Sequence, residues 1–215
     1  MTAVRQAEDF PPVVPVFAVP GAILLPGGRI PLIVFEPRYL ALVDDALGAG
    51  RLFALVQPND GAGGAVPGLY PVGTLARITA FGEAGDGRYL ITAAGLCRFR
   101  VAGEDEGRAG YRRVRADYAP YRGDLAAATV TLPERERLLA LIRAHLGVLG
   151  VGDDAEALDV LSDGELADRM AMACPFLPEE KQALLEASTH VERCRLMIGI
   201  LQRELLADAG DTTVH

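Results

Sequence analysis

Two serines and one lysine are the residues that could form a covalent hydrolase site. Such a site needs a nucleophile with a base within hydrogen-bonding reach. The chain contains only Ser162, Ser188 and Lys181 of these types, and both serines lie at predicted helix starts or turns. Ser188 and Lys181 would have to meet across a helix end. Because the chain also lacks a G-x-x-x-x-G-K-S/T phosphate loop, we predict that it is not an ATP-driven peptidase and not an enzyme.

One pair of residues has the spacing of a metal site. His190 and Cys194 are four residues apart on a predicted helix, and Cys174 could be a third ligand. The alternative is a histidine in the first helical turn and small buried cysteines in the core. We favour this alternative and expect no metal and no other cofactor.

A cluster of arginines is the feature that could bind nucleic acid. Between Arg98 and Arg122 there are seven arginines and four acidic residues. A basic strand face could contact RNA, whereas the alternative is a solvated face whose arginines pair with nearby acids. The whole chain has a net charge of −8, so RNA binding through Arg98–Arg122 is kept only as an alternative function.

Composition indicates a folded protein in a reducing compartment. Half of the 215 residues are hydrophobic, which is enough for a sizeable core. No apolar run is long enough for a membrane helix, and residues 1–12 lack the apolar core of a signal peptide. The three cysteines form no CxxC motif and no even-numbered disulfide framework. We therefore expect a cytoplasmic protein that does not bind membranes.

The hydrophobic pattern predicts strands first and helices afterwards, which gives an α+β fold. Short runs rich in Val, Ile and Phe, bounded by Gly and Pro, predict β-strands around one helix that starts near Pro37. After a linker near residues 121–131, apolar residues recur at helical spacing. We predict a β-rich barrel over 12–122 and a helical bundle over 123–207, with flexible tails at 1–11 and 208–215.

The opening stretch carries a resemblance to a known family. The box Phe35-Glu36-Pro37-Arg38-Tyr39, with the prolines and glycines before it, is similar to the start of the LON substrate-binding domain found at the N-terminus of the ATP-dependent protease La. GTLARI at 73–78, DGRYLITAAGLCRFRV at 86–101 and LADRMAMACPFLPEEKQALLEA at 166–187 resemble later motifs of the same family.

The resemblance implies a PUA-like barrel in a stand-alone, bacterial-type member of the family. It also implies a non-catalytic domain that binds unfolded or extended polypeptide. Recruiting clients to a separate ATP-dependent protease or chaperone, as an adaptor for proteolysis or quality control, is a further hypothesis. We expect the contact surface to comprise an apolar turn and parts of the box, namely Ile23, Leu24, Leu25, Pro26, Phe35, Pro37, Arg38 and Tyr39. The turn is expected to be exposed, because three large apolar residues in a Pro/Gly loop do not easily all face inward.

For Phe35–Tyr39 an alternative reading is structural. Phe35 and Tyr39 would fasten the strand to the following helix, Glu36 would cap that helix, and Glu36 and Arg38 would form a local ion pair.

Overall fold

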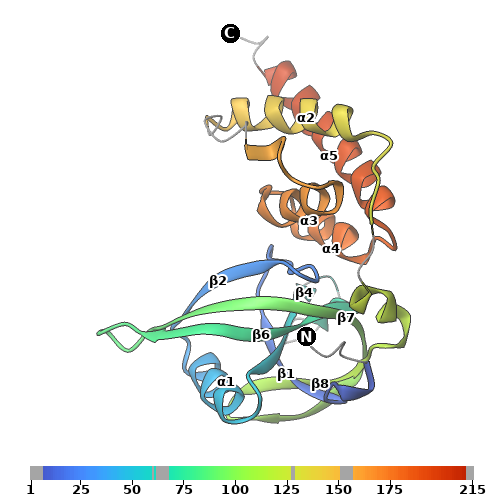
Figure 1. The fold of residues 1–215 in the computed structure, drawn as a ribbon. Helices are drawn as coiled ribbons and strands as arrows, with labels where there is room; N and C mark the ends of the chain where they lie inside the picture. Colours follow the sequence, from blue (N-terminus) through green and yellow to red (C-terminus); the bar gives the residue numbers. More distant parts are fainter. Residues whose placement is uncertain (1–6, 60, 62–67, 127–128, 151–156, 212–215) are drawn as a thin grey trace. The chain divides into compact units, whose positions relative to one another are not determined.

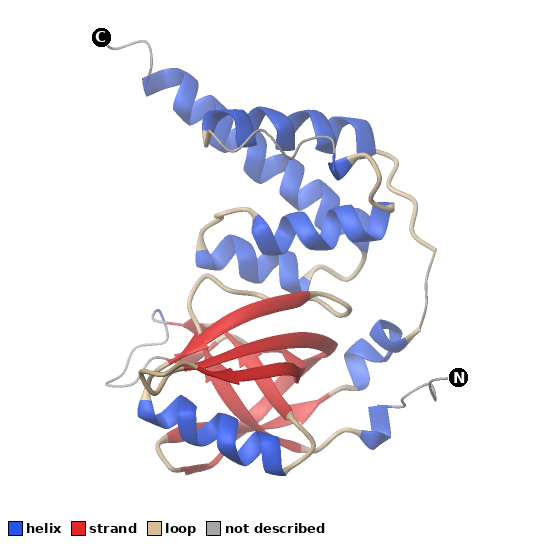
Figure 2. Ribbon diagram, turned by 60° about the vertical axis from the view of Figure 1, so that its left-hand side comes forward, coloured by secondary structure: helices blue, strands red, loops and turns tan. Residues whose placement is uncertain are grey.

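The computed structural model describes residues 7–59, 61, 68–126, 129–150 and 157–211, with side chains described to 207. The chain divides into two compact units, Met1–Ala127 and Ala128–His215. All described strands belong to the first unit, whereas the second is helical (Figure 1; Figure 2). The predicted α+β class is confirmed. No helix among the described residues is long and apolar enough to cross a bilayer.

The first unit, called here the barrel unit, is a closed ring of five strands with a sixth strand attached outside it. The ring runs β1-β3-β6-β7-β8 and closes because β8 pairs with β1. Among the described strands, β1 and β3 pair in parallel and the other pairs are antiparallel. Its strands are β1 (Val13–Ala18), β2 (Arg29–Val34), β3 (Leu52–Val56), β6 (Val72–Glu83), β7 (Tyr89–Arg108) and β8 (Tyr111–Asp117), and a separate short pair is β4 (Pro58–Asn59) with β5 (Gly68–Leu69).

The long strand β7 pairs with three other strands, β2, β6 and β8. β7 pairs with β2 over Tyr89–Ala94 and with β8 further along, so β2 lies beside its first half only (Figure 1). The β6–β7 register shifts next to Gly95, where the glycine predicts a bulge or bend, and this prediction is confirmed. The ring encloses a core that includes Val14, Val16, Leu75, Phe99 and Val114.

Short helices complete the barrel unit. Helix α1 (Pro37–Gly48) begins with Pro37 in its first turn, and η3 (Ala119–Leu125) packs on β7. The prediction of a flexible arm over residues 1–11 is wrong for the described part. Ala7–Asp9 form the 3-10 helix η1, and Phe10 is buried against Tyr118 as part of the hydrophobic core of the barrel unit. Residues 1–6 lie outside the described residues.

The second unit, called here the helical unit, has four α-helices among its described residues, and they pack mainly on the last one. These are α2 (Arg135–Val148), α3 (Asp163–Ala173), α4 (Pro178–Glu186) and α5 (His190–Asp211). Ser162 and Glu165 form the predicted capping box at the start of α3, with Glu165 N donating to Ser162 Oγ at 3.4 Å. Residues 208–211, predicted as a tail, continue α5, and 212–215 lie outside the described residues.

Candidate functional site

The turn expected to form the exposed contact surface faces inward. Ile23, Leu24 and Leu25 are each at most 2% exposed, so the expectation of exposure is wrong, and Pro26 is half-buried. Two distant residues explain this burial. Thr74 Oγ1 donates to the carbonyl oxygen of Leu24 at 2.5 Å, which satisfies a polar group that would otherwise be buried unpaired. A Cβ on Gly95 would lie 2.3 Å from the Leu25 carbonyl oxygen, so only glycine leaves room for the turn.

Two residues of the Phe35–Tyr39 box hold the fold together. Tyr39 is buried, its ring stacks on Phe17 with centroids 4.1 Å apart, and its hydroxyl donates to the Ala18 carbonyl oxygen at 3.0 Å. Burial raises the pKa of Tyr39. Arg38 forms an exposed 2.7 Å ion pair with Glu36. The predicted ion pair is therefore confirmed. Tyr39 has a structural role, but it fastens α1 to β1 and not to the preceding strand β2. Glu36 makes no side-chain capping hydrogen bond.

Phe35 does not fasten the strand to the helix but is 64% exposed, and Pro37 is exposed beside it. Two further large apolar residues share this exposure, Ile33 at 57% and Leu90 at 49%. Ile33 and Leu90 are register partners across β2 and β7, so their side chains lie next to each other on one face of the sheet. We call Ile33, Phe35 and Leu90 the β2–β7 apolar surface.

Sequence reasoning missed Ile33 and Leu90 because the run Ile30–Phe35 is apolar at nearly every position. Such a run is typical of a strand buried on both faces. In the structure the burial of β2 alternates instead, with Arg29, Pro31 and Ile33 exposed and Val34 buried. The signal available in the sequence was Pro31, since proline inside a strand favours an edge position.

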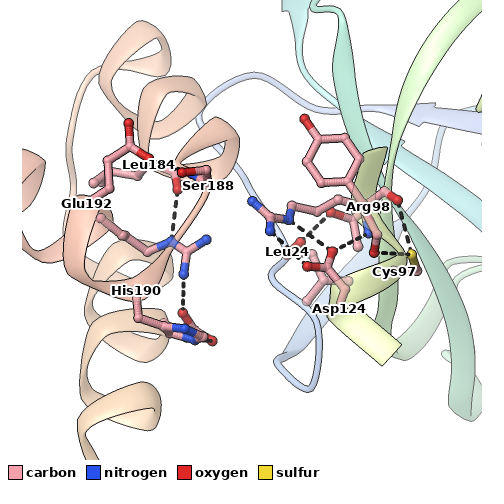
Figure 3. A network of polar contacts seen from close by, with 12 residues as sticks. Leu24, Cys97, Arg98, Asp124, Leu184, Ser188, His190 and Glu192 are labelled. Carbon is pink, nitrogen blue, oxygen red and sulfur yellow. Dashed lines mark hydrogen bonds and ion pairs between the residues drawn. The ribbon is translucent and has the colours of Figure 1, made fainter. Parts of the chain in front are cut away.

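The arginines between Arg98 and Arg122 are mostly paired with acids. Arg98 is the most buried of them, and Asp124 accepts hydrogen bonds from its backbone N, Nε and Nη2 at 2.8–3.0 Å (Figure 3). Its guanidinium also lies over the Tyr121 ring, 4.7 Å from the centroid. Further ion pairs are Arg108–Asp45, Arg112–Glu104, Arg115–Asp105 and Arg122–Glu8. This pairing favours the solvated-face alternative over a free basic stripe.

The serine and lysine considered for hydrolysis are each held by another partner. Ser188 Oγ donates to Glu192 Oε2 at 2.6 Å (Figure 3). Lys181 is buried, its Nζ donates to the Met172 carbonyl oxygen, and burial lowers its pKa. Ser162 Oγ is engaged with Glu165. The described residues therefore contain no Ser–Lys pair arranged for nucleophilic attack.

His190 and Cys194 belong to different local environments. His190 Nε2 lies 3.2 Å from Asp168 Oδ2 on α3, and Asp168 Oδ1 accepts from the buried Arg193 at 2.7 Å. Arg193 also donates to the Leu184 carbonyl oxygen, so this network joins α5 to α3 and α4 (Figure 3). Cys194 is buried, which raises the pKa of its thiol. Among the described residues no group of three His, Cys, Asp or Glu side chains is arranged to hold a metal ion.

Comparison with known proteins gives one consistent result. The family described as the ATP-dependent protease La (LON) substrate-binding domain matches residues 13–203. The chain is 29% identical over 206 residues to Lon protease 2 of Myxococcus xanthus, and 32% identical over 205 residues to Lon protease 2 of Sorangium cellulosum. These alignments cover 92% and 89% of the chain but only 24% and 25% of the relatives, so the chain spans about a quarter of their length.

Two solved structures share the fold. The Lon N-terminal domain protein from Xanthomonas campestris superimposes with a TM-score of 0.62 at 24% identity, covering 87% of this chain and 97% of that one. The N-terminal domain of the Mycobacterium avium complex Lon protease gives a TM-score of 0.64 at 21% identity, covering 88% and 98%.

Proposed function

Because the chain belongs to the family of ATP-dependent protease La (LON) substrate-binding domains, we propose that it binds extended, apolar polypeptide segments without acting on them chemically. The observation that carries this proposal is the β2–β7 apolar surface. Large apolar side chains that meet on one exposed face mark interaction sites in soluble proteins, whereas scattered ones are ordinary. Of the residues expected from the sequence, Phe35 and Pro37 remain candidates for contact, whereas the buried side chains of Ile23–Leu25 and Tyr39 do not.

Affinity would come from removing Ile33, Phe35 and Leu90 from water, at roughly 25 cal/mol per Å² of apolar area. Ordering an unfolded segment offsets part of this gain, so binding should be weak to moderate. Weak binding suits a domain that samples clients and releases them. Delivery of clients to a separate ATP-dependent protease or chaperone remains part of the proposal. So does a cytoplasmic location, which is supported by three free cysteines, Cys97, Cys174 and Cys194.

The test is binding of the full chain to a permanently unfolded protein, with reduced and carboxymethylated α-lactalbumin as the fluorescent probe. We expect binding that changes little between low and high salt, because burial of apolar area is not screened. Native α-lactalbumin is the folded control and should not bind.

Two matched variants locate the site. Phe35→Ser should weaken binding by roughly tenfold, as expected for a central apolar contact. Val160→Ser removes an apolar residue of the helical unit that is 84% exposed and should bind like the unchanged chain. Equal binding by the two variants, or no binding by the unchanged chain, would contradict the proposal.

A further inference from the structure

The β2 strand has a strand neighbour on one side only. It pairs with β7 from Arg29 opposite Ala94 to Val34 opposite Tyr89. On its other side no strand of the described residues pairs with it, and it ends the strand order of the sheet. An edge of this kind presents backbone N–H and C=O groups that another extended chain can match.

The pairing pattern shows which backbone groups face outward. Gly95 N donates to the Gly28 carbonyl oxygen at 3.0 Å, so the Gly28 carbonyl, just before β2, points toward β7. In an antiparallel pair this direction alternates along the strand. The odd-numbered residues Arg29, Pro31 and Ile33 therefore direct their backbone groups to the outer edge. Pro31, which has no N–H to donate, fits that position without costing β7 a hydrogen bond.

Little protects this edge from a second chain. Natural edge strands are usually blocked by charges, bulges or covering segments. Within β2 the only charge is Arg29 at the start and the only proline is Pro31, whereas Leu32, Ile33 and Val34 are all apolar. The outward backbone of Ile33 also adjoins the exposed side chains of Phe35 and Leu90.

We propose that an extended polypeptide adds to the outer edge of β2 as a further strand, with large apolar side chains at alternate positions against Ile33 and Phe35. The inference rests on the proposed function and names its binding mode. Backbone hydrogen bonds supply sequence-independent affinity in this mode, and the alternate side chains supply preference. A domain that accepts many clients needs this combination.

Arg29 adds a charge preference to the site. It is exposed at the start of β2, and no acidic side chain of the described residues lies within ion-pair distance of it. At the other end, Glu36 is already neutralised by Arg38. An occupant with an acidic residue beside Arg29 is therefore favoured over one with a basic residue there, and this preference weakens with salt.

The test uses three labelled peptides with the full chain. The first is Asp-Val-Thr-Val-Thr-Val-Thr-Asp, and the other two carry N-methyl groups on all the Val nitrogens or on all the Thr nitrogens. In a strand, alternate N–H groups point to opposite edges, so only one methylated set would face β2. Strand addition therefore predicts that one methylated peptide loses at least roughly tenfold in affinity while the other binds like the first. Contact through side chains alone predicts that both methylated peptides behave alike.

A pair of substitutions tests the protein side. Ile33→Ala removes the side chain but keeps the outward N–H, whereas Ile33→Pro removes both. We expect Ile33→Pro to bind the first peptide roughly fivefold more weakly than Ile33→Ala. Both variants should retain the thermal unfolding transition of the unchanged chain, since the backbone N–H of Ile33 points away from β7 and the substitutions remove no hydrogen bond between the two strands.

The outcomes separate this inference from the proposed function. Two results would support strand addition: one methylated peptide loses affinity while the other does not, and Ile33→Pro binds the first peptide more weakly than Ile33→Ala. Equal effects of the two methylations, or equal binding by the two variants, would overturn strand addition while binding of unfolded α-lactalbumin still supported the proposed function. Failure to bind either the peptide or the unfolded protein would overturn both.

Discussion

The barrel unit and the helical unit leave different kinds of surface to solvent. In the barrel unit, Ile33 and Leu90 are partners in one strand pair, Phe35 directly follows β2, and the less exposed Phe81 lies on β6. In the helical unit, exposed large apolar residues come from separate segments, namely Val148, Leu149, Val160, Leu177, Leu196 and Leu206. Helix backbones bond internally. Among the described residues, exposed apolar side chains therefore adjoin an open strand edge in the barrel unit alone, which is why we propose binding there.

The two units also differ in how they hold a buried arginine. In the barrel unit Arg98 takes a single acid, Asp124, and both side chains are about one-tenth exposed. In the helical unit Asp168 is more exposed, at 18%, and is shared between Arg193 and His190. Both arginine side chains are buried, Arg98 at 8% and Arg193 at 3% exposure, so removing the acid leaves a buried guanidinium without its carboxylate in either unit.

The largest expected effect comes from removing these acids. Asp124→Ala should lower the free energy of unfolding by about 3–5 kcal/mol, because the buried Arg98 loses the carboxylate that accepts hydrogen bonds from its backbone N, Nε and Nη2. Asp168→Ala should cost less, about 2–3 kcal/mol, because Arg193 keeps its bond to the Leu184 carbonyl oxygen. Urea unfolding measures both.

Asp86→Ala is the control, since its pair with Arg88 is half-exposed, and it should leave unfolding unchanged. A smaller loss for Asp124→Ala than for Asp168→Ala would contradict the comparison of the two sites.

A smaller effect is expected from adding a methyl group at Gly95, where the turn Ile23–Leu25 passes close to β7. Gly95→Ala should destabilise the barrel unit by about 2–3 kcal/mol, because the new Cβ would meet the Leu25 carbonyl oxygen. Gly82→Ala, on the neighbouring strand, meets no atom within 4 Å and serves as the control. If the two alanine variants melt at the same temperature, the turn does not depend on Gly95 in the way described.

The smallest expected effect is a loss of stability at alkaline pH, to which buried thiols of both units contribute. Burial raises the pKa of Cys97 in the barrel unit to about 12 and that of Cys174 in the helical unit to about 11. A thiol whose pKa is higher in the folded state than in the unfolded state stabilises the fold at pH values below its unfolded pKa, which is near 8.5. This stabilisation is lost as the pH rises through the folded pKa. Each thiol should therefore lower the free energy of unfolding by about 1 kcal/mol as the pH rises from 8 to 9.5.

Lys181 in the helical unit acts in the opposite direction. Its lowered pKa means that the unfolded state holds more protons, so its contribution to stability rises with pH up to the unfolded value. Lys181 should therefore offset part of the loss from Cys174 and Cys194 in the helical unit, and Cys97→Ala should flatten the loss of stability that the barrel unit contributes in alkali. Thermal unfolding of the unchanged chain and of Cys97→Ala from pH 8 to 10 measures this effect. If the melting temperatures of the two chains fall equally steeply with pH, Cys97 is not a source of the alkaline loss.

Local patterns predicted the elements of this fold because their causes are local. The Ser162–Glu165 cap, the start of α1 at Pro37 and the bulge beside Gly95 each depend on residues a few positions apart. The burial of Leu24 could not be found this way, since it depends on Thr74, fifty residues further along. The exposure of Ile33 was missed for a related reason: an apolar run fixes the strand, whereas the covering of each face is decided by distant segments.

The most direct test of a binding surface in the barrel unit is hydrogen–deuterium exchange of the full chain with and without bound carboxymethylated α-lactalbumin. We expect slower exchange in Arg29–Val34, including the outward amide of Ile33, and no change in the helices of the other unit. Slower exchange confined to α2–α5, with β2 unchanged, would contradict the account.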